Sequence, residues 1–136
     1  MPVSGRSPAN MMDSYTDMRR IQLAAARKFT PEQAALLSFC EPYAAVRVRD
    51  EAGLDHTFLF MERIDGPVLD SRTTIDQKLA TAFGYPIYLR VIDTIRLVIA
   101  DQLNIEIIDI HPQNVLTVKD GAATRYTVID PRSDKN

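Results

Sequence analysis

Apolar side chains recur at helical spacing near the start of the chain. From Asp13 to Lys28 they return every three or four positions, which predicts an amphipathic helix. Thr30 then has the character of a helix N-cap, because Pro31 follows at the first helical position and Gln33 can close a capping box. A second helix is therefore expected over residues 31–39.

Alternating polar and apolar positions follow and predict strands. Residues 43–49 alternate with a period of two, which favours a strand with one face in water. Residues 50–55 contain the Asp and Gly residues typical of a hairpin turn. Residues 57–61 are apolar enough for a central strand, and Gly66 and Pro67 interrupt the chain after them.

The second half of the chain returns to helical spacing. Residues 73–83 predict a short helix, and Gly84 lies where a left-handed cap is expected. Pro86 opens the longest expected helix, which runs to Leu103. One face of this helix is apolar and consists of Tyr88, Val91, Ile92, Ile95, Val98, Ile99 and Leu103.

Three polar residues flank the last two predicted strands. Residues 115–118 and 126–129 predict a hairpin joined by a tight Asp-Gly turn. Antiparallel pairing puts the end of the second strand beside the start of the first. Asn114 and Asp130 are therefore expected to converge, and Asp109 lies on the loop that enters the hairpin.

These residue types suit phosphoryl transfer. Mg²⁺ prefers oxygen ligands and usually binds one or two protein side chains together with phosphates and water, and Asn114 and Asp130 would supply such oxygens. Asp109 could orient a substrate hydroxyl or accept its proton. Each residue alone is better explained as a turn former that bonds locally. The combination is more specific, because Asp109 and Asn114 lie five positions apart with Pro112 between them.

The segment Asp109-Ile110-His111-Pro112-Gln113-Asn114-Val115-Leu116, followed by Val128-Ile129-Asp130, resembles the catalytic segment of the protein-kinase-like superfamily. It is most similar to the small-molecule branch, the aminoglycoside and choline phosphotransferases. The resemblance covers residues 43–132 and implies an α+β, truncated protein-kinase-like fold with a small antiparallel sheet and hinge, a central long helix and a catalytic-loop β-hairpin. It implies Asp109 as the catalytic residue, and Asn114 and Asp130 as ligands of Mg²⁺ and ATP.

The same resemblance assigns the adenine-binding hinge to residues 58–66. Met61 would stand at the gatekeeper position, and the carbonyl of Glu62 and the backbone of Ile64 would face adenine. The sequence departs from the family in having no glycine-rich phosphate loop, no phosphate-binding lysine strand and no substrate-binding helices after Asp130. A kinase core trimmed at both ends is therefore expected.

Composition narrows the functional classes. The 136 residues are 46% hydrophobic and 25% charged, which predicts one globular domain over residues 13–136 after a flexible arm at 1–12. A net charge of −2 provides no basic field for nucleic acid or an anionic membrane, and no apolar run has the length of a membrane span. The single cysteine, Cys40, predicts a buried, small hydrophobic residue. One cysteine and no secretory signal together favour a cytoplasmic location.

Two functions remain open at this stage. The first is a minimal or degenerate phosphotransferase that binds Mg-ATP and transfers phosphate to a hydroxyl of a protein or small molecule. The second is a non-catalytic, pseudokinase-type interaction module that binds a protein partner. A third interpretation is an unrelated small α+β domain with a chance match. Apolar surface left by the missing C-terminal helices would predict a protein partner or self-association.

Overall fold

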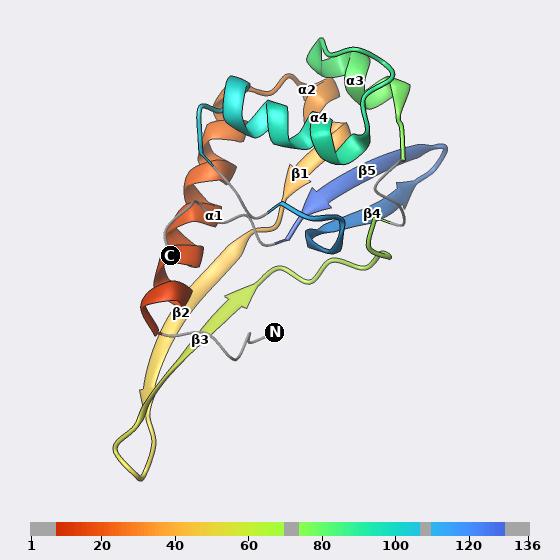
Figure 1. Ribbon diagram of the computed structural model, residues 1–136. Helices are drawn as coiled ribbons and strands as arrows, with labels where there is room; N and C mark the ends of the chain where they lie inside the picture. Colours follow the sequence, from red (N-terminus) through yellow and green to blue (C-terminus); the bar gives the residue numbers. More distant parts are fainter. Residues whose placement is uncertain (1–7, 70–73, 107–109, 130–136) are drawn as a thin grey trace.

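The computed structural model describes residues 8–69, 74–106 and 110–129, and Figure 1 shows how they are arranged. The described elements are α1 (Pro8–Lys28), α2 (Pro31–Leu36), β1 (Leu37–Phe39), β2 (Pro42–Arg49), β3 (Asp55–Met61), α3 (Gln77–Phe83), α4 (Val91–Leu97), the π-helix η1 (Val98–Gln102), the 3₁₀ turn η2 (Pro112–Asn114), β4 (Val115–Asp120) and β5 (Ala123–Val128).

The strands form two separate sheets. One has the order β1-β5-β4, with β1 parallel and β4 antiparallel to β5. The other is the antiparallel pair β2-β3, whose turn projects beyond the remaining elements (Figure 1). Helices α2, α3 and α4 lie on one side of the three-stranded sheet, and α1 packs against β1, β2 and β3. The α+β class predicted from the sequence is confirmed at this level.

Two apolar clusters hold these elements together. The larger lies between the helices and the three-stranded sheet. It includes Ile21, Leu37, Phe39, Leu79, Phe83, Val91, Ile95, Val98, Ile99, Ile110, Val115, Tyr126 and Val128. The smaller cluster consists of buried Met18, Cys40 and Leu59 with partly buried Tyr15, Ala45, Met61, Ile64 and Ile129 around them. It joins α1, the base of the β2-β3 hairpin and the end of β5.

Each of the first two helices has one end at the predicted residue and one end elsewhere. Helix α1 ends at Lys28 as predicted but begins at Pro8, so the predicted arm of residues 1–12 is helical from Pro8 onward. The capping box is confirmed, because Gln33 N donates to Thr30 Oγ1 (3.2 Å) and Thr30 N donates to Gln33 Oε1 (2.9 Å). The predicted end at residue 39 is wrong, since α2 stops at Leu36 and residues 37–39 pair with β5.

The predicted hairpin of residues 43–61 forms, but its burial differs from expectation. The turn is confirmed, with Asp50 N donating to the Leu54 carbonyl and Gly53 at φ +82°. The prediction of a central strand over residues 57–61 is wrong, because within the described chain β3 pairs only with β2. The side chains of residues 46–49 are all exposed, so this half of β2 faces solvent on both sides. The cause is the projection of the hairpin beyond α1.

The helices of the second half are shorter than predicted. Helix α3 begins after Asp76, whose carboxylate accepts from Leu79 N, and it ends at Gly84 in the left-handed conformation as expected. The single helix expected over residues 86–103 is instead α4 followed by η1. Tyr88, predicted on the apolar face, lies before α4 and is exposed. The expected end at Leu103 is confirmed by Asn104, at φ +55°.

The chain after the predicted hinge runs along the free side of β4. Thr117 N donates to the Pro67 carbonyl (2.7 Å), and Leu69 N donates to the Val115 carbonyl (2.8 Å). Gly66 lies so close to this strand that a Cβ atom there would approach the Thr117 carbonyl oxygen. This contact fixes the hinge segment relative to the β4-β5 hairpin.

Candidate functional site

The base of the β4-β5 hairpin positions Asn114. Val115 pairs with Val128, and Ile129 N donates to the Asn114 carbonyl (2.9 Å). Asn114 N in turn donates to the His111 carbonyl (2.9 Å), which closes the η2 turn. The prediction that the end of the second strand lies beside the start of the first is confirmed. Asn114 is therefore held next to the residue that precedes Asp130 in the sequence.

The other two residues of the predicted catalytic set cannot be placed in the same way. Asp109 and Asp130 lie outside the residues that the structure describes. Their convergence with Asn114 around one cation stays a prediction.

The predicted hinge leaves β3 at Met61 and runs beside the residues that follow β1. Glu62 N donates to the Glu41 carbonyl (2.8 Å), and Glu41 N donates to Glu62 Oε1 (3.2 Å). The Glu62 carbonyl, predicted to face adenine, accepts the Cys40 thiol (3.2 Å). A carbonyl oxygen has two lone pairs, so this contact leaves one acceptor position on Glu62.

The hinge and the hairpin base meet in the smaller apolar cluster. Met61 and Ile64 of the hinge pack there together with Ile129, beside buried Cys40. Cys40 N donates to the Val128 carbonyl (2.9 Å), which extends the pairing of β1 with β5 up to this point. Two segments that are distant in the sequence thus reach a common apolar patch.

Cys40 confirms its predicted role as a small buried residue. Its side chain is almost inaccessible, and burial, with added repulsion from the carboxylates of Glu62 and Glu41, raises the pKa of the thiol to about 12. The thiol is therefore protonated at neutral pH. Because the thiolate is the reactive form, Cys40 is not a nucleophile in this state.

The charged residues around the cluster are of both signs. Arg19 of α1 forms an ion pair with Glu41 (3.6 Å), and buried Asp17 lies 3.9 Å from Arg20. Within residues 8–69, 74–106 and 110–129, no three His, Cys, Asp or Glu side chains gather as metal ligands. Among the predicted metal ligands, the described part of the chain contains Asn114, whose amide oxygen is of a type that suits Mg²⁺.

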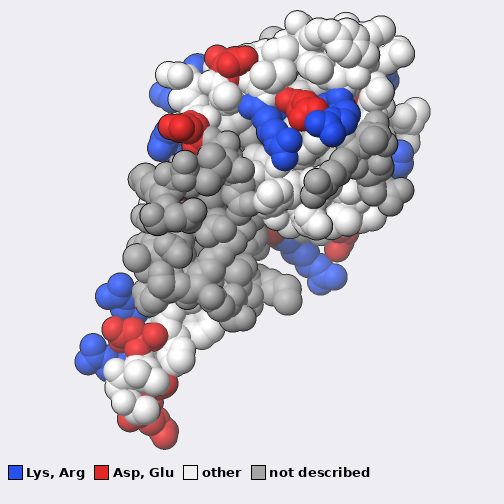
Figure 2. Space-filling view, viewed as in Figure 1, with Lys and Arg blue, Asp and Glu red and all other residues white. Residues whose placement is uncertain are grey.

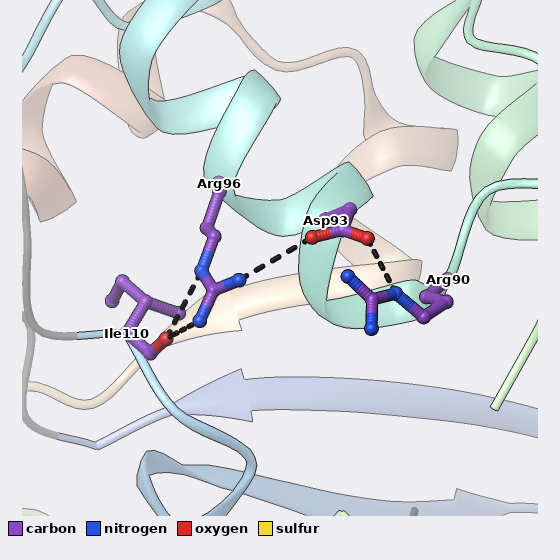
Figure 3. Close-up of polar contacts among 4 residues, drawn as sticks. All are labelled: Arg90, Asp93, Arg96 and Ile110. Atoms are coloured by element: carbon purple, nitrogen blue, oxygen red, sulfur yellow. Dashed lines mark hydrogen bonds and ion pairs between the residues drawn. The ribbon is translucent and has the colours of Figure 1, made fainter. Parts of the chain in front are cut away.

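Arg96 is a residue of this region that the sequence did not reveal. Its Nε and Nη2 donate to the carbonyl of Ile110 (3.1 and 2.6 Å), and its Nη1 contacts Asp93 Oδ1 at 3.3 Å (Figure 3). Asp93 Oδ2 also accepts from Arg90 Nε at 2.6 Å. Figure 2 shows this group as basic atoms on both sides of an acidic one over α4. The spacing of three residues signals the ion pairs, but nothing in the sequence signals the bond to Ile110.

No protein-family model matches the sequence, and no curated protein matches it. Among the described helices, none has both the length and the apolar character needed to cross a membrane.

Proposed function

We propose that this protein is a minimal kinase-like phosphotransferase that binds Mg-ATP. One observation carries the proposal: Ile129 is hydrogen-bonded to Asn114 and also packs in one cluster with Met61 and Ile64. The segment expected to bind adenine and the segment expected to bind the phosphates are therefore neighbours. One ATP molecule must reach both segments, because its adenine and its phosphates are covalently linked.

Each predicted site residue has a separate task in this proposal. Met61 and Ile64 would offer apolar contacts to the adenine ring, and the remaining lone pair of the Glu62 carbonyl would accept its amino group. Asn114 and Asp130 would hold Mg²⁺, which when bound neutralises charge on the phosphates. Asp109 would orient the substrate hydroxyl and accept its proton. The acceptor is a hydroxyl of a protein or of a small molecule.

Thermal unfolding with and without Mg-ATP tests the proposal. A ligand at one hundred times its Kd stabilises the folded state by about 2.7 kcal/mol, so the melting temperature of the wild type should rise. Asn114→Ala and Asp130→Ala should remove the part of this rise that requires Mg²⁺. Gln113→Ala is the matched control, because Gln113 is an exposed amide in the same turn. If the melting temperature of the wild type does not change when Mg-ATP is added, the proposal is contradicted.

A second candidate function is a non-catalytic interaction module, favoured by the apolar surface of the projecting hairpin. The exposed large side chains on β2, β3 and their turn are Tyr43, Val46, Val48, Leu54 and Phe60. Such a patch is typical of protein association. Gel filtration at rising protein concentration should then show self-association, and Val46→Thr with Val48→Thr should reduce it while keeping β-branched residues in the strand. Monomers at every concentration would argue against self-association through this hairpin.

A further inference from the structure

The loop that carries Asn114 is attached to the fold at two places. At its end, the Asn114 carbonyl accepts from Ile129 N, which ties the loop to the β4-β5 hairpin. At its beginning, the Ile110 carbonyl accepts two donors of the Arg96 guanidinium, which ties the loop to α4 (Figure 3). Between these points lies only the short η2 turn.

The contact at Ile110 is built from a fixed donor. Asp93 holds the third nitrogen of the guanidinium, and Asp93 is itself held by Arg90. The Ile110 side chain is buried in the larger apolar cluster, which anchors this residue in the fold. A planar guanidinium held on one side by a carboxylate presents its remaining donors in one direction.

We propose that Arg96 is a positioning residue, which orients the Asn114 side chain for Mg²⁺ by fixing the start of its loop. This inference rests on the proposed function, because it assigns Arg96 to the same metal site. Arg96 touches neither nucleotide nor metal and acts only through the Ile110 carbonyl. Its loss should therefore weaken the metal-dependent part of nucleotide binding and leave the adenine contacts unchanged.

Hydrogen exchange without any ligand tests the positioning itself. In Arg96→Gln the amides of Asn114 and Ile129 should exchange about tenfold faster, because a charge-assisted hydrogen bond that restrains the loop is lost. The amide of Glu62, bonded to Glu41, should not change. Lys78→Gln is the control, since it removes an exposed cation on the neighbouring α3 and leaves Arg90, Asp93 and Arg96 in place. Unchanged exchange at Asn114 in Arg96→Gln overturns the inference.

Nucleotide affinity measured with Mg²⁺ and with EDTA tests the consequence. The Kd for ATP in EDTA divided by the Kd with Mg²⁺ measures how much the metal strengthens binding. This ratio should fall about tenfold in Arg96→Gln, as expected for one lost charged hydrogen bond. The Kd in EDTA should stay at the wild-type value, and Arg96→Lys should restore part of the ratio. If Arg96 had only a structural role, Arg96→Gln would lower the melting temperature and leave this ratio unchanged. That result would overturn the inference about Arg96 but not the proposed function. A wild type that binds no nucleotide overturns the proposed function and, with it, the metal role of Arg96.

Discussion

Gly66 lies against the backbone of Thr117 and leaves no room for a side chain. A Cβ atom at this position would be 3.1 Å from the Thr117 carbonyl carbon and closer still to its oxygen. Gly66→Ala should therefore force the hinge segment away from β4 and lower the free energy of unfolding by about 1–3 kcal/mol. Urea unfolding of the variant and the wild type measures this difference.

The control for this substitution is the neighbouring Asp65→Ala. Asp65 is largely exposed and its carboxylate pairs with Arg63 at 3.2 Å, so its loss should change stability little. If Gly66→Ala unfolds at the wild-type urea concentration, the close approach to Thr117 does not exist in solution.

Single residues were predictable where their role is local. Thr30 and Gln33 lie within one helical turn of each other, and Gly84 directly follows the helix it caps, so sequence spacing alone indicated both roles. Gly66 was predicted only to interrupt the chain, because Thr117 is distant in the sequence. Arg96 was missed for a related reason, since its partner is a backbone carbonyl and carries no side-chain signature.

At the scale of elements, errors occurred where strands compete with helices. Residues 37–39 continue the helical spacing of α2, yet pairing with β5 satisfies their backbone groups and buries Leu37 and Phe39. A parallel partner from the other end of the chain leaves no mark on a local pattern. The same limit explains β3, whose apolar residues predicted a central strand but occupy a two-stranded hairpin.

The β4-β5 hairpin shows the opposite case. Its strands and tight turn are close in sequence, and both were predicted together with the approach of Asn114 to the end of the second strand. Gly121, at φ +64°, occupies the turn as expected. The placement of Asn114 beside the end of β5 therefore follows from sequence spacing. The contribution of Asp109 and Asp130 remains a prediction for the Mg-ATP experiment.

At the scale of the whole molecule, each apolar cluster contains a weak acid whose pKa is raised by burial. Cys40 lies in the smaller cluster, where burial raises its pKa to about 12. Tyr126 lies in the larger cluster and donates its hydroxyl to Asp76 Oδ2 at 2.8 Å. Burial first, and the Asp76 carboxylate second, raise the pKa of Tyr126 above its usual range. Both clusters thus resist ionisation of their acid.

This arrangement predicts that the folded protein loses stability in alkali. Above the ordinary thiol pKa of 9.0 the unfolded chain releases the Cys40 proton while the folded chain keeps it, so the stabilisation is complete below that pH and is lost as pH rises toward 12. Ionisation of Tyr126 in the unfolded chain adds a further loss of stability above the ordinary tyrosine pKa of 10.0.

Urea unfolding at several alkaline pH values should show a shallower loss of stability in Cys40→Ala and in Tyr126→Phe than in the wild type. Tyr88→Phe, which alters an exposed ring, should keep the wild-type slope. If the free energy of unfolding falls equally steeply with pH in all four proteins, burial does not raise the pKa of either Cys40 or Tyr126.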